Sequence, residues 1–590
     1  MTRRAVKGGL LAGVAILYLS LVGMVQRFDD VNLIGDVFTL GRLLIVLPPL
    51  IAGYVLARPR LRGGVMEAGS SGDAALAGVL AGAVAGGVTA AAVLLELALP
   101  EGGAGTVFVA VTPALISILT FDRSTPVGLA ILIGVCCAAG LIGGAVSAAG
   151  RARKPVLTGL VVVALMGMLQ NVIRVMLVQL HVPTAWLYSV RFGGLTYLGA
   201  AVVFLLGAAG SLAWTWRQNW LRRRAEELPT GVKVTGPDPR RIMGIALFGV
   251  FLLVLPLLLG AYLSAVLGQV GLFLLMGLGL NIVVGYAGLL DLGYVAFFAV
   301  GAYMTGILTA SANSGSVIHP GLPFLVAVPI VIVIAILTGL LIGAPVLRLR
   351  GDYLAIVTLG FGEIARVLFT SDALKPLFGG ALGLYAIPAP SLTIGNFSVT
   401  FRDPQPFYYL VLAFCAAAAF VSWRLASSRV GRAWTAMRED EQVAEVMGVS
   451  TVKYKLLAFA TGAAIGSLAG ALFAVQIGSL APTSFTVLVS IQALAIIILG
   501  GIGSIPGVIV GALVLVGLPG FLSEFQDYQL LIYGAVLVAI MLLRPQGLVP
   551  NVRRSRELQE EDVSQDKWAG DLAADEHVAP TATPLGEGAG

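Results

Sequence analysis

The residues best suited to recognise a partner lie in one internal segment, residues 428–455, which separates two long apolar runs. Its side chains include charges of both signs and a few apolar groups. The candidates for a contact surface are Arg438, Glu441, Ala444, Glu445 and Met447. Gly448 follows them, and glycine readily takes the positive φ that ends a helix. The pattern predicts a short charged helix that docks another molecule; a solvated amphipathic loop is the alternative.

A second set of candidates interrupts the apolar stretch at residues 277–303. Asn281, Tyr286 and Gly288 stand there among apolar residues, and the glycines of this stretch permit a break between two helices. A broken helix at membrane depth exposes backbone groups to a cavity, where they can hold a zwitterionic solute. The alternative is close packing of helices through small residues.

An acid and a base form the third set. Glu363 and Arg366 lie three residues apart, which places them one turn apart on the same face of a helix. Ionisable groups at membrane depth are costly, and they usually face a cavity or pair with each other. Two interpretations stay open: Glu363 lines a solute pathway with the nearby Thr358, or Glu363 and Arg366 form a self-contained pair.

Other kinds of chemistry lack the residues that they need. The three cysteines all lie in apolar runs without the spacing of metal ligands, and the three histidines are scattered. The chain has no G-x-x-x-x-G-K-[ST] phosphate loop, no nucleophile elbow and no H-E-x-x-H motif. We therefore predict no catalytic residue, no metal site and no cofactor bound by this chain.

Apolar helices must position these candidates. Of the 590 residues, 58% are hydrophobic and 12% are charged, whereas an ordinary soluble domain is roughly 25% charged. Apolar runs of about 17–25 residues recur along the chain, and each can cross the hydrocarbon core as a helix. Lipid offers the backbone no hydrogen-bond partners, so these runs must be helical, and their composition argues against a barrel. We predict an all-α, polytopic transmembrane bundle of about 16 spans.

A polar, basic stretch at residues 217–241 divides the chain. Residues 1–216 hold about six spans, and residues 242–550 hold about ten, with the charged loop at residues 424–455 between two of them. Lys and Arg collect in cytoplasmic loops. We therefore predict that the chain lies in a plasma or inner membrane, with the dividing stretch, the charged loop and both termini on the cytoplasmic side. Residues 551–590 lack the apolar side chains needed to form a core and are predicted to be disordered.

Four stretches, in order over about half of the chain, carry a resemblance to a known family. They are residues 277–303, 348–366, 428–474 and 498–512. Through them, residues 244–547 resemble the permease subunit of branched-chain amino acid ABC importers, of the LivM type. Residues 442–448, QVAEVMG, resemble a degenerate form of the E-A-A-x-x-x-G signature of importer permeases, with Gln442 and Val443 in place of Glu and Ala.

The resemblance implies an importer with several parts. A helix around the signature would couple this chain to separate ATP-binding subunits, which hydrolyse ATP. The coupling residues would be Arg438, Glu441, Ala444, Glu445, Met447 and Gly448. An H-type partner permease and an extracytoplasmic substrate-binding protein would complete the system, so this chain would be a transport subunit and not an enzyme. The expected substrates are branched-chain (hydrophobic) amino acids, with urea or short amides as the alternative.

Two interpretations from other classes remain. An ATP-independent secondary transporter or channel would need intramembrane ionisable residues for ion coupling, and these are scarce. A membrane enzyme or scaffold would need a polar cluster within residues 1–216, where only isolated polar residues such as Glu96, Asn171 and Arg174 occur. No motif indicates what residues 1–216 do.

Overall fold

The computed structural model divides the chain into two units, Met1–Gly260 (unit 1) and Ala261–Gly590 (unit 2). The residues that it describes are 2–35, 38–56, 60–62, 65–67, 71–98, 111–148, 153–179, 181–189, 193–226, 239–310, 315–346, 352–394, 397–521, 528, 531, 534, 537–538 and 546–549. The predicted tail at residues 551–590 lies outside them. Each unit has its own buried core and is described by itself.

The prediction of an all-α membrane bundle is confirmed, whereas the count of about 16 spans is not. Among the described residues, ten helices are long and apolar enough to cross a membrane, or up to eleven if one bent pair is counted as a single span. Three more apolar helices have only 10–17 residues. The difference arises because apolar composition marks a run without fixing where it bends. Residues 239–280, for instance, form the single long helix α10 (Pro239–Leu280), whose backbone leaves the helical conformation inside it at Gly260.

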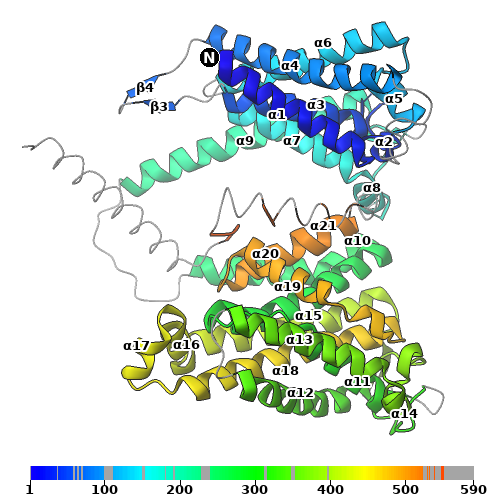
Figure 1. Ribbon diagram of the computed structural model, residues 1–590, viewed down its shortest axis with the longest axis vertical. Helices are drawn as coiled ribbons and strands as arrows, with labels where there is room; N and C mark the ends of the chain where they lie inside the picture. The colour runs from blue at the N-terminus through cyan, green and yellow to red at the C-terminus, as the bar shows by residue number, and fades with distance from the viewer. Residues whose placement is uncertain are drawn as a thin grey trace, which may run out of the picture. The chain divides into compact units, whose positions relative to one another are not determined.

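Unit 1 is a bundle of helices, coloured blue to cyan in Figure 1. The helices that precede α10 are α1 (Thr2–Leu21), α2 (Met24–Asp29), α3 (Leu40–Leu56), α4 (Ser71–Ala98), α5 (Pro113–Leu119), α6 (Thr125–Ala148), α7 (Arg153–Met168), α8 (Gln170–Gln179) and α9 (Tyr197–Glu226). Two short antiparallel pairs join some of them, β1 (Asn32–Ile34) with β2 (Phe38–Thr39) and β3 (Arg60–Arg62) with β4 (Val65–Glu67). Helices α4 and α6 pack closely, since a Cβ atom at Gly140 would lie 2.1 Å from the Gly78 carbonyl oxygen. Small residues allow this approach of two backbones.

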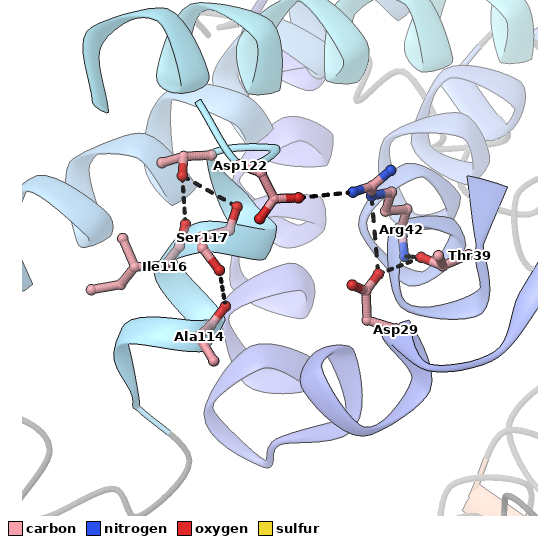
Figure 2. A network of polar contacts seen from close by, with 8 residues as sticks. Asp29, Thr39, Arg42, Ala114, Ile116, Ser117 and Asp122 are labelled. Atoms are coloured by element: carbon pink, nitrogen blue, oxygen red, sulfur yellow. Dashed lines mark hydrogen bonds and ion pairs between the residues drawn. The ribbon is translucent and has the colours of Figure 1, made fainter. Parts of the chain in front are cut away.

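A polar network joins three segments at one end of unit 1 (Figure 2). Arg42, in the first turn of α3, lies 3.4 Å from a carboxylate oxygen of Asp122 and 4.0 Å from one of Asp29. The Thr39 hydroxyl also donates to Asp29, and the Arg42 guanidinium lies 5.6 Å from the centre of the Phe121 ring. The cation is therefore balanced by two carboxylates and ties α2 and the α5–α6 turn to α3.

Unit 2 begins within α10 and carries the charged loop. Its further helices are α11 (Val295–Thr309), α12 (Phe324–Val346), α13 (Asp352–Thr370), α14 (Lys375–Phe378), α15 (Pro404–Ala426), α16 (Arg429–Glu439), α17 (Glu441–Val446), α18 (Thr451–Ile477), α19 (Val487–Gly500), α20 (Ile505–Ala512) and α21 (Leu518–Phe521). Two π-helical turns, η3 (Asn281–Tyr286) and η7 (Leu513–Gly517), follow α10 and α20. A hairpin of β5 (Ser391–Ile394) and β6 (Phe397–Thr400) precedes α15.

Helix α18 is the centre of unit 2 and packs against α11 and α12. Two thirds of its most apolar stretch is buried, a larger share than in any other span among the described residues. Its small residues bring backbones together: a Cβ atom at Gly470 would lie 1.9 Å from the Phe298 carbonyl oxygen. The Tyr294 hydroxyl donates to the Gly462 carbonyl over 2.6 Å and fixes the start of α11 against α18. Helix α18 is therefore in contact with several other elements of unit 2, among them α11, α12 and η3.

Candidate functional site

The charged loop folds into two short helices because polar residues end one and begin the next. Ser428 caps α16, and its hydroxyl accepts hydrogen bonds from the amides of Val430 and Gly431. Asp440 ends α16 and caps α17, since its carboxylate accepts from the amides of Gln442 and Val443 over 2.8 and 3.0 Å. Side-chain acceptors at these positions satisfy the first amides of a helix, which otherwise lack partners. In Figure 1 both helices lie at one end of unit 2, away from α14.

Two interactions anchor the charged loop to the base of α18. The Trp434 side chain is completely buried, and its indole N–H donates to the Tyr454 carbonyl over 2.8 Å. The Lys455 ammonium, also buried, lies 2.6 Å from a carboxylate oxygen of Glu441. Glu441 was predicted to belong to the outer contact surface, and the structure instead turns its carboxylate towards α18. Ala444, another predicted contact residue, belongs to α17 and its side chain is buried.

The outer face of α17 is apolar and uncovered. Val446 and Met447 are 86% and 78% exposed, and Val443 is 57% exposed. These three residues fall at helical positions i, i+3 and i+4, so their side chains share one face. Glu445 is also exposed beside them. An apolar face this open on a six-residue helix has no internal role in packing and is suited to a partner.

Gly448 ends α17 as the sequence predicts. Its φ is +86°, and the amide of Val449 donates to the Ala444 carbonyl over 3.0 Å, which closes the turn typical of a glycine after a helix. A Cβ atom at Gly448 would meet nothing within 4 Å. Glycine is favoured here by backbone conformation and not by lack of space.

Arg438 connects the charged loop to the interrupted helix near residue 281. Its guanidinium donates to the Gly285 carbonyl over 2.6 Å. Gly288 lies against the same side chain: its φ is +74°, and a Cβ atom there would come within 2.7 Å of Arg438 Cγ. Arg438 was predicted to face a partner, and the structure adds a contact with η3 that its sequence position did not indicate.

The predicted break at residues 277–303 is present as the π-helical turn η3 followed by a non-helical stretch up to α11. A π-turn widens the helix and is common at functional positions. Asn281 is fully buried in it, and its side-chain oxygen accepts from the Gly503 amide over 2.8 Å. Thr358 of α13 is buried as well, and its hydroxyl accepts from the Leu292 amide over 3.1 Å. Tyr286 is half-buried and packs against the core of unit 2.

The structure thus places Asn281, Tyr286, Gly288 and Thr358 in or against the broken segment, where the side chains of Asn281 and Thr358 accept hydrogen bonds from backbone amides. Glu363 lies apart from them. Its carboxylate is 2.8 Å from Arg366 Nε, and both side chains are a little over one third exposed. Two interpretations were left open for Glu363 and Arg366, and the structure shows the one in which they pair with each other.

Two residues that matter for this arrangement escaped the sequence analysis. They are Trp434 and Lys455. A lysine near the start of a long apolar helix is a visible signal, since a buried cation needs a counter-ion nearby. The contact between Asn281 and Gly503 joins two glycine-rich interruptions 222 residues apart, and no local pattern reveals it.

Known proteins resemble unit 2. The family described as the permease component of branched-chain amino acid transport systems matches residues 262–541. The high-affinity branched-chain amino acid transport system permease protein LivM of Escherichia coli (strain K12) is 42% identical over 306 residues, which cover 49% of this chain and 70% of the relative. The probable LivM of Methanocaldococcus jannaschii is 26% identical over 49% of this chain and 93% of the relative.

A related subunit also matches. The permease protein LivH of Escherichia coli (strain K12) is 33% identical over 159 residues, which cover 26% of this chain and 50% of that protein. No solved structure matches the chain. A single short stretch could match by chance, but identity of 42% over 306 residues cannot. This chain is a multi-pass membrane protein that belongs to the family of permease components of branched-chain amino acid transport systems.

Proposed function

We propose that this permease subunit imports branched-chain amino acids, and that ATP-binding subunits drive it by docking on the outer face of α17. The uncovered apolar face of Val443, Val446 and Met447 carries the proposal, because exposure of three apolar side chains to water on one short helix is unfavourable and is typical of an interaction site. The names of the LivM relatives support the substrate class.

The contacts of the charged loop suggest how a push on α17 reaches the membrane. Glu441 and Lys455 link α17 to α18 over 2.6 Å, and Trp434 links α16 to the same helix. Arg438 links α16 to η3. Packed elements move as bodies and switch between discrete arrangements, so a small displacement of α17 would shift α18 and η3 together. We propose that this concerted shift opens the solute pathway alternately to the two sides.

The remaining parts of the system follow from this mechanism. ATP would be bound and hydrolysed by the partner subunits, and this chain would bind no cofactor. An H-type permease would be the second membrane subunit, and an extracytoplasmic binding protein would supply the solute. We place the charged loop and both termini in the cytoplasm and the chain in the plasma or inner membrane. Import of urea or short amides is the second candidate, since Asn281 and Thr358 are neutral polar groups.

Substitution of Val446 tests the docking face. Val446→Asp adds a charge where the side chain is 86% exposed, so folding should be unaffected while the apolar contact with the ATPase is lost. Val446→Leu keeps the face apolar and is the matched control. We expect leucine uptake by whole cells, and recovery of the ATPase with the purified permease, to fall by about tenfold or more in the first variant, because one charge desolvated at an interface costs several kcal/mol.

Two results would argue against the proposal. If both variants recover the ATPase and import leucine as the unsubstituted chain does, α17 is not the docking helix. If Val446→Asp loses uptake but retains the ATPase, α17 acts in a later step and the docking surface lies elsewhere. An immunoblot of the membrane fraction confirms that each variant is inserted at the same level.

A further inference from the structure

A cavity of about 370 Å³ lies within unit 2, at a distance from the charged loop. Its walls come from α10, α11, α18, α19 and the turn before α19. The side chains that decide its character are Gln269, Phe273, Phe298, Phe473, Gln476 and Ser484. The volume lies in the range of roughly 300–1,000 Å³ that is usual for small-molecule sites.

The aromatic wall of the cavity is held rigidly. The Phe298 and Phe473 rings lie 5.1 Å apart between centroids, and each also contacts Phe485, at 5.6 and 5.9 Å. Phe485 is almost fully buried, which fixes the other two rings from behind. A wall of packed aromatic rings is suited to an apolar side chain.

The polar groups of the cavity are neutral. Gln269 and Gln476 offer amide donors and acceptors, and Ser484 offers a hydroxyl that can do both. No hydrogen bond from either glutamine side chain is formed within the described part of the chain. Amides and hydroxyls can satisfy an ammonium and a carboxylate at once, whereas a lone ionic side chain on a solute would lack a counter-charge here. The lining is therefore matched to a zwitterion with an apolar side chain.

The position of the cavity along α18 matters for transport. Gln476 is 25 residues beyond Thr451, the first residue of α18, so the helix carries it about 38 Å from the base to which the charged loop is anchored. That distance exceeds the roughly 30 Å of a hydrocarbon core. If the charged loop is cytoplasmic, as proposed above, the cavity lies at the extracytoplasmic end of unit 2.

The mouth of the cavity carries two polar side chains and one apolar side chain, Ile477, which is 52% exposed. Gln269 and Ser484 are both exposed, on α10 and on the turn before α19. An amide that faced lipid tails would lack hydrogen-bond partners at considerable cost. The mouth therefore opens to water or to another polar surface, as an entry point requires.

We infer that this cavity is the entry chamber of the permease, in which a neutral zwitterionic amino acid with an apolar side chain is received between the phenylalanine wall and the side chains of Gln269, Gln476 and Ser484. The inference rests on the proposed function. Weak, uncharged contacts suit a chamber that must release its solute as readily as it receives it.

Cysteine accessibility tests this inference in intact cells with the full transport system. The three native cysteines are replaced by alanine, and Ser484→Cys introduces a thiol at the mouth with little change in size. Leu488→Cys is the control, because Leu488 is 55% exposed on α19 beside Val489 but does not line the cavity. The cells are treated from outside with a negatively charged, membrane-impermeant thiosulfonate, with and without leucine, and leucine uptake is measured after washing.

We expect the reagent to abolish most leucine uptake in the Ser484→Cys variant, and leucine present during treatment to slow the loss. The Leu488→Cys variant should keep its uptake. If Ser484→Cys itself impairs uptake before treatment, Val489→Cys, which also lines the cavity, takes its place.

The possible failures are distinguishable. If the unsubstituted chain imports leucine, but the Ser484→Cys variant is insensitive or is not protected by leucine, the chamber assignment is wrong and the proposed function stands. If the unsubstituted chain imports urea and no leucine, the proposed substrate is wrong, and the zwitterion assigned to the chamber is wrong with it.

Discussion

The pairing of Glu441 with Lys455 shows how one residue can look like a surface contact and act inside the protein. Lys455 is 5% exposed, whereas the Glu441 side chain is about a quarter exposed, at 26%. Loss of the Glu441 carboxylate would leave the buried Lys455 ammonium without a counter-ion. Loss of the Lys455 ammonium would leave the Glu441 carboxylate, which can still reach water. The two losses are therefore not equivalent, although both break the same ion pair.

This asymmetry gives a stability prediction. We expect Glu441→Gln to lower the free energy of unfolding by about 2–3 kcal/mol, and Lys455→Met by about 1 kcal/mol, since a stranded buried charge is the larger penalty. The double variant should be more stable than Glu441→Gln alone. Thermal unfolding of the purified chain in detergent, followed by tryptophan fluorescence, ranks the three variants. A lower melting temperature for Lys455→Met than for Glu441→Gln would contradict the buried-cation account.

At the scale of elements, the charged loop and the broken helix form one assembly. Arg438 crosses from α16 to η3, and Asn281 crosses from η3 to the glycine-rich segment at Gly503. Each contact joins a side chain to a backbone group, so the separation of the two segments cannot change without a hydrogen bond being lost. The charged loop is thereby connected to both interruptions of unit 2.

Substitution of Arg438 should separate docking from transmission. Arg438→Met keeps much of the aliphatic contact with Gly288 and removes the donor to Gly285. A hydrogen bond from a charged donor contributes about 1.5–3 kcal/mol, so we expect leucine uptake to fall by roughly tenfold or more. The ATPase should still be recovered with the permease. Arg438→Lys is the control and should retain part of the activity, because lysine restores a charged donor of similar length.

A variant that lost the ATPase together with uptake would place Arg438 on the docking surface. Full uptake by Arg438→Met would show that the hydrogen bond from Arg438 to Gly285 does not transmit movement from α16 to η3. In either case the proposed connection from the charged loop through η3 to the segment at Gly503 would need revision.

The sequence predicts local features of this assembly and misses the distant ones. The end of α17 at Gly448 follows from the residue type alone, because glycine takes φ near +86° without strain. The break at Asn281 and Gly288 also follows from small and polar residues in an apolar run. The contacts between Asn281 and Gly503 and between Arg438 and Gly285 could not be predicted, since they depend on how separate helices pack. Ala444 was assigned to the predicted contact surface for a similar reason: a six-residue helix gives too few turns to reveal which face is buried.

Across the whole molecule, the two units carry different features. Unit 2 contains the family match at residues 262–541, the charged loop and the cavity. Unit 1 contains a separate bundle whose clearest polar feature is the Arg42 network, which serves to hold helices together. The count of about 16 spans is not confirmed: ten or eleven candidate spans occur among the described residues, where bends and short helices divide the apolar runs.

Import of branched-chain amino acids under the control of α17 is tested by the uptake of radiolabelled leucine and of radiolabelled urea in cells that lack the gene. The gene is restored unsubstituted, with Gly448→Arg, or with Gly448→Ala as the control. Space for a side chain is open at this position, so alanine should add only about 1 kcal/mol of backbone strain, whereas arginine places a charge beside the apolar docking face.

We predict that the unsubstituted gene and Gly448→Ala restore leucine uptake, that Gly448→Arg does not, and that urea uptake is the same in all strains. Leucine uptake that never depends on the gene, or that Gly448→Arg restores fully, would contradict the account.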